Sequence, residues 1–330
     1  MVENILVTGG AGYIGSSLVN VLLNKKFKVC IVDNLSTGSE SLIAKKAKFY
    51  KLNILSTKKL KKIIIKNHIT TVFHLAAKLS VNESQKNPQK YYFNNVLGTT
   101  SLLESIKNTN VKKIIFSSTC AVYGNQKIVN ENSRINPESI YGLSKYLAEI
   151  CIKKFTENNS NVKYAILRYF NVCGAEPKLK IGPIQNNGQL FKNLAEQSIK
   201  KLPSINIFGN KYSTMDGTCV RDYIHVFDIS QIHLLAFNYL NKYNKNLLIN
   251  CGYGKGYSVN EIIDKFQKIC KKKFTINFKD KRQGDIASIT ANNKKIKKLL
   301  KFKEKFHKIE AIIKTCIEWE KIRKENASLK

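Results

Sequence analysis

Three observations predict a doubly wound α/β fold, in which helices cover both faces of a parallel sheet. Apolar, strand-like runs alternate with helical patterns from residue 4 to residue 170. A glycine-rich turn over residues 9–15 joins the first run to the first helical pattern, and the second run ends in Asp33. Because crossovers between parallel strands are right-handed, these features together predict a buried parallel sheet of the Rossmann type.

The first part of the chain carries five predicted strands with helices between them. The strands cover residues 4–8, 28–32, 69–77, 113–119 and 162–170. The helices cover residues 16–24, 90–108 and 144–157. The carboxyl ends of parallel strands meet at one edge of a sheet, which is where such sheets bind ligands. We therefore expect residues that follow different strands to meet there.

The glycine-rich turn predicts a dinucleotide site. Glycines at positions 9, 12 and 15 let the backbone turn tightly and approach a pyrophosphate, while the free amides at the start of the helix receive its negative charge. Asp33 lies eighteen residues after the last of these glycines. A carboxylate there accepts hydrogen bonds from the adenosine ribose and repels a 2′-phosphate, which favours NAD over NADP.

Tyr141 and Lys145 are four residues apart at the head of a predicted helix, so their side chains share one face. A tyrosine normally titrates near pH 10, and lowering its pKa to about 7 requires about 4 kcal/mol. A buried lysine together with a second cation, such as an oxidised nicotinamide, could supply that energy. The alternative is a surface tyrosine followed by a solvated lysine.

The second part of the chain begins with a loop rich in glycine and proline that reaches residue 188. Helices are predicted over residues 190–200 and 228–240, strands over 205–208 and 247–251, and residues 255–330 as helical apart from a strand over 274–278. We predict a NAD-binding domain over residues 1–171, to which residues 216–254 return. A smaller mixed α/β substrate domain is predicted over residues 172–215 and 255–330.

Composition narrows the functional classes. The net charge of +33 invites a nucleic-acid interpretation, but the lysines are spread over the whole chain without a basic stripe, so we expect no dedicated nucleic-acid partner. Eight cysteines without C-x-x-C spacing and five histidines without H-x-x-x-H spacing predict reduced thiols and no metal site. With no apolar run of about 18 residues, we expect no membrane partner and a cytoplasmic protein.

The motifs resemble those of the extended short-chain dehydrogenase/reductases. The glycine turn, Ser118-Thr119 and the Tyr141/Lys145 pair carry this resemblance. Residues 168–171, 207–210, 216–226 and 282–285 resemble, more narrowly, the UDP-glucose 4-epimerases of that family. Related dehydratases typically carry an acidic pair after the threonine, where this chain has Cys120 and Ala121.

The resemblance implies an NAD-dependent homodimer that inverts carbon 4 of a UDP-hexose by oxidation, rotation of the 4-keto sugar and re-reduction. It implies Tyr141 as the base, Lys145 as its cationic support and Thr119 as a hydrogen-bond partner of the same oxygen. The implied cofactor-binding residues are Gly9, Gly12, Tyr13, Ile14, Gly15, Asp33, Asn34, Asn53, Ile54, Leu75, Ala76, Ala77, Asn94, Lys145 and Phe170. The implied substrate-binding residues are Thr119, Tyr141, Asn171, Gln189, Leu190, Phe208, Arg221, Arg282, Asp285 and Ile289.

Several positions depart from the family pattern. Asn53 stands where an aspartate commonly meets adenine, and Gln189 and Lys192 replace a common Asn or His and a Pro near the nucleotide. Ile289 is intermediate in size at a position where a large residue excludes N-acetylated sugars and a small one admits them.

Other interpretations remain open at this stage. The same chemistry on UDP-N-acetylhexosamines is one, a decarboxylase or simple dehydrogenase is another, and a non-catalytic nucleotide- or RNA-binding protein is a third. Arg221 could form a structural ion pair with Asp222, and Phe208 could be an ordinary core aromatic. We interpret His74 and His225 as structural.

Overall fold

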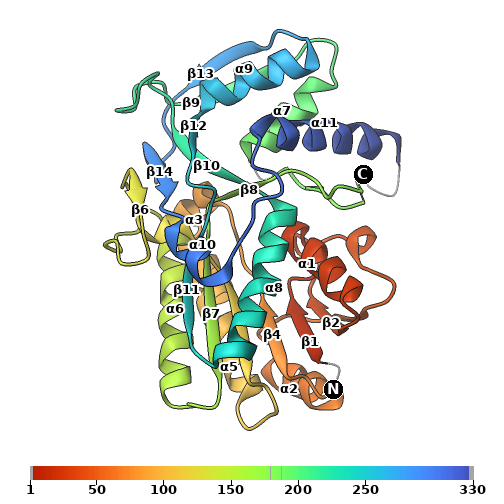
Figure 1. Ribbon diagram of the computed structural model, residues 1–330. Helices are drawn as coiled ribbons and strands as arrows, with labels where there is room; N and C mark the ends of the chain where they lie inside the picture. The colour runs from red at the N-terminus through yellow and green to blue at the C-terminus, as the bar shows by residue number, and fades with distance from the viewer. Residues whose placement is uncertain (1–2, 179, 187, 327–330) are drawn as a thin grey trace.

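The computed structural model describes residues 3–178, 180–186 and 188–326, and its centre is a seven-stranded sheet (Figure 1). The strand order is β11-β7-β5-β4-β1-β2-β3, and every neighbouring pair is parallel. The strands are β1 (Asn4–Thr8), β2 (Lys28–Asp33), β3 (Lys48–Lys51), β4 (Thr71–His74), β5 (Lys113–Thr119), β7 (Lys163–Tyr169) and β11 (Leu247–Cys251). The predicted parallel sheet is therefore confirmed.

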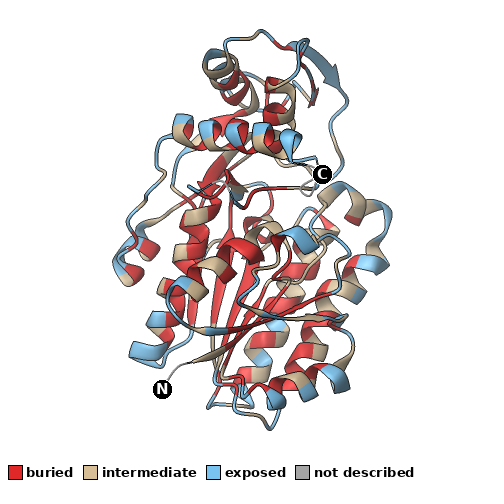
Figure 2. Ribbon diagram, turned by 90° about the vertical axis from the view of Figure 1, so that its right-hand side faces the viewer, coloured by how far each residue is buried: buried red, intermediate tan, exposed pale blue. Residues whose placement is uncertain are grey.

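Helices cover both faces of this sheet. Helices α1 (Tyr13–Asn24) and α8 (Val226–Tyr243) pack on one face, and α2 (Thr57–Lys66), α5 (Gly98–Ile106) and α6 (Ile140–Glu157) pack on the other. Figure 2 shows the buried strands between helices whose outer sides are exposed. Ile5 and Val7 of β1 face the first layer and Leu6 faces the second, and all three are fully buried. Burial on both sides explains why these strands are continuous apolar runs.

The edge of the sheet contains two elements that the sequence pattern misses. Strand β3 has four residues, and none of them is fully buried. Helix α2 buries only Leu60 and Ile64, and its other positions are mostly lysine and isoleucine. Because the apolar residues are not confined to the buried face, the helical period is hard to see.

Two predicted elements need correction. The strand predicted over residues 69–77 ends at His74, so that residues 75–77 form a loop at the carboxyl end of the strand. The helix predicted over residues 90–108 is divided into α4 (Pro88–Tyr91), a π-helical segment (Tyr92–Leu97) and α5. A π-helical turn contains one more residue per hydrogen-bonded ring, so it shifts the face that the helix presents.

The second part of the chain forms a separate layer above the carboxyl ends of the large sheet (Figure 1). A five-stranded mixed sheet has the order β12-β10-β14-β6, with β8 beside β10, and β9 pairs with β13. The strands are β6 (Ile128–Val129), β8 (Asn171–Cys173), β9 (Ser204–Phe208), β10 (Val220–His225), β12 (Gly256–Ser258), β13 (Thr275–Lys279) and β14 (Ser288–Ala291). Helices α7 (Leu190–Ser198), α9 (Val259–Cys270) and α11 (Ile309–Glu325) share one core.

The segment predicted as a loop after Asn171 therefore contains β8, and the region predicted as helical after residue 255 contains β12 and β14 as well as β13. The three missed strands β8, β12 and β14 have three or four residues and pair with distant β10 or β6, so their sequences are too short to show a period. The short helices α3 (Val81–Lys86) and α10 (Lys294–Leu300) complete the layers. In the described part of the chain, no helix is both long and apolar enough to cross a bilayer.

Candidate active site

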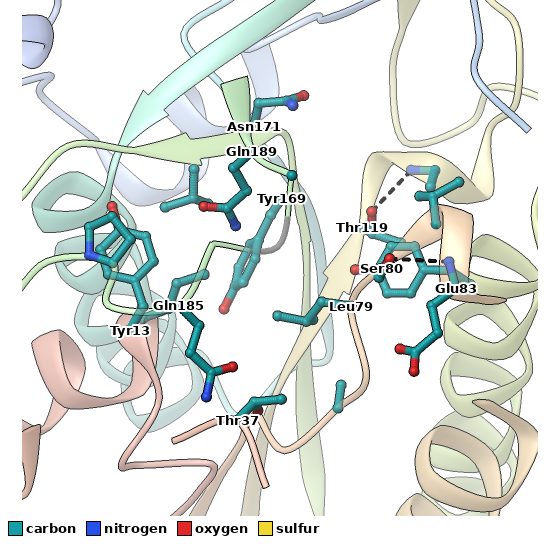
Figure 3. Close-up of a pocket in the computed structure, with 18 of the residues that line it drawn as sticks. Tyr13, Thr37, Leu79, Ser80, Glu83, Thr119, Tyr169, Asn171, Gln185 and Gln189 are labelled. Atoms are coloured by element: carbon teal, nitrogen blue, oxygen red, sulfur yellow. Dashed lines mark hydrogen bonds between the residues drawn. The ribbon is translucent and has the colours of Figure 1, made fainter. Parts of the chain in front are cut away.

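A cavity of about 950 Å³ lies between the large sheet and the second layer. Figure 3 shows Tyr13, Gln185 and Gln189 on one side of it and Ser80, Glu83 and Thr119 on the other, with Tyr169 between them. The predicted site residues that line it are Gly9, Gly12, Tyr13, Ile14, Gly15, Asp33, Asn34, Ile54, Leu75, Ala76, Ala77, Asn94, Thr119, Tyr141, Lys145, Phe170, Asn171, Gln189, Leu190, Phe208, Arg221, Arg282, Asp285 and Ile289. The structure thus brings together residues from both parts of the chain.

Asn53 is the predicted site residue that does not line this cavity. Its side-chain oxygen accepts a hydrogen bond from the Leu55 amide at 3.0 Å, which closes a local turn. Its neighbours Leu52 and Ile54 reach the cavity instead.

The glycine turn between β1 and α1 is closed by contacts that leave no room for side chains. Gly9 has a φ of +74°, and a Cβ on it would lie 2.7 Å from the Ala76 amide nitrogen. A Cβ on Gly15 would lie 2.1 Å from the Gly9 oxygen. Helix α1 has no side-chain cap, so its first amides have no partner within the helix. The turn therefore offers main-chain donors to an anion at the helix start.

Asp33 is held at the end of β2 by two main-chain amides. Its carboxylate accepts hydrogen bonds from Ala11 at 3.0 Å and from Leu35 at 2.8 Å. The first bond ties the acid to the glycine turn. Each carboxylate oxygen has further acceptor capacity, so ribose hydroxyls could also bind there. These groups fit the pyrophosphate and adenosine ribose of NAD.

Tyr141 and Lys145 lie on the first turns of α6. Ser139 caps this helix by accepting a hydrogen bond from the Gly142 amide at 3.1 Å. Gly142 allows close approach to the turn after β5, because a Cβ on it would lie 2.6 Å from the Ala121 oxygen. This packing places Thr119, at the end of β5, beside the Tyr141 phenol, and the two side chains share a hydrogen bond.

Burial dominates the pKa values of both groups. It raises the pKa of Tyr141 to about 12, and the hydrogen bond with Thr119 opposes that increase only in part. It lowers the pKa of Lys145 to about 7, whereas the charge of Glu149 raises it. The Lys145 ammonium lies 4.2 Å from the centre of the Phe116 ring. These two side chains alone do not make a base at neutral pH, so base catalysis needs another positive charge.

A buried ion pair supports the same helix one turn further on. Both oxygens of Glu149 bind the Arg168 guanidinium, at 2.9 and 2.7 Å, and neither residue is more than 2% exposed. Ser118, the neighbour of Thr119, donates to Glu149 at 2.5 Å. Glu149 therefore fixes the end of β5 against α6.

His74 lies beneath Lys145 and is neutral. Its ring nitrogens bind Thr8 at 2.8 Å and Thr99 at 3.0 Å. Burial, followed by the charge of Lys145, lowers its pKa to about 3. His225 stacks on Phe306 with ring centres 3.8 Å apart, and burial also lowers its pKa to about 3. Both contact sets are those of structural histidines.

The opposite end of the cavity is basic. Arg221 on β10 donates to the carbonyl oxygens of Val220 at 2.9 Å and Ile286 at 2.7 Å. The Arg282 guanidinium lies 3.6 Å from the centre of the Phe208 ring. Burial raises the pKa of Asp285, and the charges of Arg221 and Arg282 oppose that increase. An anion entering this end would meet two guanidinium groups.

Two of the alternative interpretations fail on this geometry. Asp222 does not pair with Arg221 in the described structure, since its carboxylate accepts bonds from the amides of Tyr253, Gly254 and Ala291 at 2.8–3.2 Å. Burial raises the pKa of Asp222 to about 6. Phe208 is only partly buried and lies in the cavity wall, so it is not a core aromatic.

Several lining residues are missed by the sequence reasoning, among them Leu79, Ser80, Tyr169, Gln185 and Cys219. Tyr169 is the last residue of β7, so the rule that ligands bind at the carboxyl ends of strands could have identified it. The others belong to loops or short strands whose position depends on distant contacts, so no local signal marks them.

The chain matches known proteins along most of its length. The model of the NAD dependent epimerase/dehydratase family matches residues 5–252. A UDP-glucose 4-epimerase of Lactobacillus helveticus is 38% identical over 320 residues, which cover 96% of this chain and 97% of that protein.

Solved structures agree with this match. A UDP-glucose 4-epimerase of Stenotrophomonas maltophila, with bound NAD and formylated UDP-arabinopyranose, has a TM-score of 0.92 and 31% identity, over 98% of this chain and 99% of that chain. A UDP-Glc/GlcNAc 4-epimerase of Campylobacter jejuni has a TM-score of 0.83 and 37% identity, over 97% and 99% of the two chains.

Proposed function

The chain belongs to the NAD dependent epimerase/dehydratase family, and we propose that it interconverts UDP-galactose and UDP-glucose by NAD-dependent inversion of carbon 4. The observation that carries this proposal is one cavity with two chemically different ends. Thr119, Tyr141 and Lys145 belong to the large sheet and its helix α6, and Arg221 and Arg282 belong to the second layer. Such a cavity suits a sugar nucleotide whose hexose faces the cofactor.

The residues present fit NAD. The uncapped start of α1 would hold the pyrophosphate, and Asp33 would bind the adenosine ribose. Residues 75–77 would line the rest of the dinucleotide site. When bound, NAD supplies a two-electron acceptor for carbon 4, returns the hydride, and adds a positive charge to the site.

Tyr141 would accept the proton of the hexose 4-hydroxyl and return it to the same oxygen when carbon 4 is reduced from its other face. Its pKa of about 12 must fall for this role, and the positive charges of a protonated Lys145 and of the bound cofactor would together lower it. Glu149 favours the protonated form of Lys145, because its charge raises the lysine pKa. Thr119 would hydrogen-bond the oxygen that Tyr141 deprotonates.

The nucleotide must be held firmly while the sugar turns. Arg221 and Arg282 would clamp the two phosphates, and Asp285 would accept from the uridine ribose. Phe208 and Asn171 would line the uracil and sugar ends of the site. These roles suit the structure, since the hexose end of the cavity carries no comparable pair of guanidinium groups among its lining residues.

An elimination reaction is less well supported. The residues after Thr119 are Cys120 and Ala121, and Cys120 is a buried thiol whose pKa burial raises to about 12. Neither side chain can act as an acid and base pair at neutral pH. Apart from NAD, oxidation and re-reduction need only the side chains of Tyr141, Lys145 and Thr119.

We propose that Ile289 limits the width of the sugar site. Ile289 on β14 is 1% exposed and packs in the same small core as Phe170, so its side chain cannot move far without disturbing neighbours. We propose hexoses as the main substrates, with N-acetylhexosamines as the second candidate because the Campylobacter jejuni relative is a UDP-Glc/GlcNAc 4-epimerase.

The test is to incubate the purified protein separately with UDP-galactose and UDP-N-acetylgalactosamine in the presence of NAD, and to analyse the nucleotide sugars by chromatography. Conversion of UDP-galactose to UDP-glucose is expected. If neither sugar is inverted, the proposed function is wrong. If the N-acetylated sugar is inverted faster, UDP-N-acetylhexosamines and not UDP-hexoses are the main substrates.

We further propose that residues 1–171, together with α8 and β11, bind the cofactor and that residues 172–215 and 255–330 bind the UDP-sugar. Of the segment 216–254 predicted to return to the first domain, β10 pairs instead within the second-layer sheet. A homodimer is supported by exposed apolar side chains on the π-helical segment Tyr92–Leu97 and on α6, namely Phe93 (58% exposed), Leu97 (45%) and Ile150 (36%). Eight free cysteines suit a reducing compartment, which supports the cytoplasm. Sedimentation of wild type and Phe93→Asp would test the dimer.

A further inference from the structure

We propose that a closed ring of four charges between α7 and α11 positions the part of the pocket wall that contacts the substrate nucleotide. The ring consists of Lys192, Glu196, Glu320 and Arg323, which we call the α7–α11 ring. The inference rests on the proposed function, because it names the side of the UDP-sugar site that these positioning residues control.

Each member of the ring contacts two groups of opposite charge. The Lys192 ammonium binds Glu320 and lies 3.3 Å from Glu196. The Arg323 guanidinium binds Glu320 at 2.9 Å and Glu196 at 3.2 Å. Lys192 and Glu196 are one turn apart on α7, and Glu320 and Arg323 are one turn apart on α11. The spacing within each helix therefore matches the alternation of charge across the interface.

Burial of the inner ion pair favours a single register between α7 and α11. The side chains of Lys192 and Glu320 are 0% and 1% exposed, whereas those of Glu196 and Arg323 are 24% and 21% exposed. A buried charge that loses its partner is costly, so the inner pair tolerates only the register in which both charges are matched. The outer pair closes the ring where it reaches solvent.

The ring connects to the pocket through Glu196. Its second oxygen accepts a hydrogen bond from the Asn186 side chain at 2.7 Å, and the Asn186 oxygen accepts one from the Gly188 amide at 3.0 Å. Gly188 lines the pocket opposite Arg282, because a Cβ on it would lie 3.8 Å from the guanidinium. Lys192 itself does not line the pocket. The lysine that departs from the family pattern at this position therefore acts on the pocket indirectly, through the residues that do line it.

Helix α11 holds the same wall at a second point. The Trp319 indole donates to the Pro183 oxygen at 3.1 Å, and Pro183 also lines the pocket. The neighbouring Gly182 lies against the Trp319 ring. Gly182 and Pro183 are thus fixed from the side of α11.

A second ion pair on α11 provides a control. Glu310 binds Lys265 of α9 at 2.6 Å, and the two side chains are 49% and 31% exposed. Neither residue lines the pocket. A variant at Glu310 removes an ion pair from the same helix without touching the connection to Asn186.

The experiment measures UDP binding by calorimetry and steady-state kinetics with UDP-galactose, using the NAD-loaded enzyme. The variants are Asn186→Ala, Glu196→Ala, their double mutant and the control Glu310→Ala. We expect each single variant at the ring connection to raise the Kd for UDP about fivefold and KM similarly, with kcat within about twofold. The double mutant should match the single variants, because both break the same connection. Glu310→Ala should bind UDP like wild type.

Unchanged UDP affinity in Glu196→Ala would overturn the proposal, and so would fivefold effects that multiply in the double mutant. Glu196→Gln separates charge from hydrogen bonding, because its amide oxygen can still accept from Asn186. Partial recovery of UDP affinity is expected there, and no recovery would overturn the role of this bond. Absence of epimerase activity in a wild type that binds UDP would contradict the proposed function alone, since the binding cycle does not depend on turnover.

Discussion

The two ends of the cavity are built by different means. At the cofactor end, main-chain groups make the walls: the glycine turn excludes any Cβ, and Asp33 is fixed by the amides of Ala11 and Leu35. At the substrate end, charged side chains from distant segments do the same work, as in Arg221, Arg282 and the α7–α11 ring. A substitution in a main-chain wall meets backbone atoms that cannot move aside. A wall held by several charged side chains can instead lose its contacts one at a time.

The largest expected effect lies where the two ends meet. Tyr141→Phe removes the proton acceptor but leaves the ring in place, so we expect kcat to fall about 1,000-fold, or about 4 kcal/mol, with NAD still bound. Activity and NAD content of the purified variant measure this. Tyr164→Phe, at the start of β7 outside the cavity, is the control. A Tyr141→Phe enzyme of unchanged rate would remove this residue as the base.

The substrate end is tested next by Lys192→Met, which leaves Glu320 buried with only Arg323 as a partner. We expect a loss of about 3 kcal/mol in the free energy of unfolding, measured in urea. The double variant Lys192→Met, Glu320→Leu should recover part of this loss, because no buried charge is left unpaired. A single variant as stable as wild type would contradict the importance of the inner pair.

The cofactor end is tested by Gly15→Ala, whose Cβ would lie 2.1 Å from a main-chain oxygen. We expect NAD affinity to fall about 30-fold, or about 2 kcal/mol, because the turn must open to admit the methyl group. Gly12→Ala, with its Cβ 3.2 Å from the same oxygen, should lose less. Titration of each variant with NAD compares them, and equal affinities would show that the turn is not a rigid wall.

The smallest effect concerns a neutral histidine behind the cofactor end. His233 binds the Tyr169 hydroxyl at 2.5 Å and the Ile229 oxygen at 2.9 Å, and burial lowers its pKa to about 4. Since the folded pKa lies below the unfolded value of about 6.5, the unfolded chain binds more protons between pH 4 and 6.5. The stability of the wild type therefore decreases as the pH is lowered through that window.

His233→Gln removes this dependence. The stability difference between wild type and variant should shrink by about 1 kcal/mol from pH 7.5 to pH 5.5, measured by urea unfolding at both values. A difference that stays constant would mean that the pKa of His233 is the same in the folded and the unfolded protein.

The same contrast explains what can be predicted from the sequence. The glycine turn, Asp33 and the Tyr141/Lys145 pair are set by spacing within short segments, and the structure places all of them in one cavity. Short β8 is missed because it forms only with the distant β10, and lysine-rich α2 is missed because its apolar residues are not confined to its buried face. Lys192 stands out in the sequence as unusual, but only the fold shows that it turns away from the cavity toward Glu320. Asn53 fails for a related reason, since a local turn takes its side chain.

The position of β11 has a consequence for how the protein is made. This strand pairs with β7 at the edge of the large sheet, yet the whole of β8, α7, β9, β10 and α8 is synthesised between the two. On the ribosome, the outer edge of β7 stays open until residue 251 emerges. An open strand edge pairs readily with other chains, so nascent chains stalled in this interval are the form of the protein most prone to aggregate.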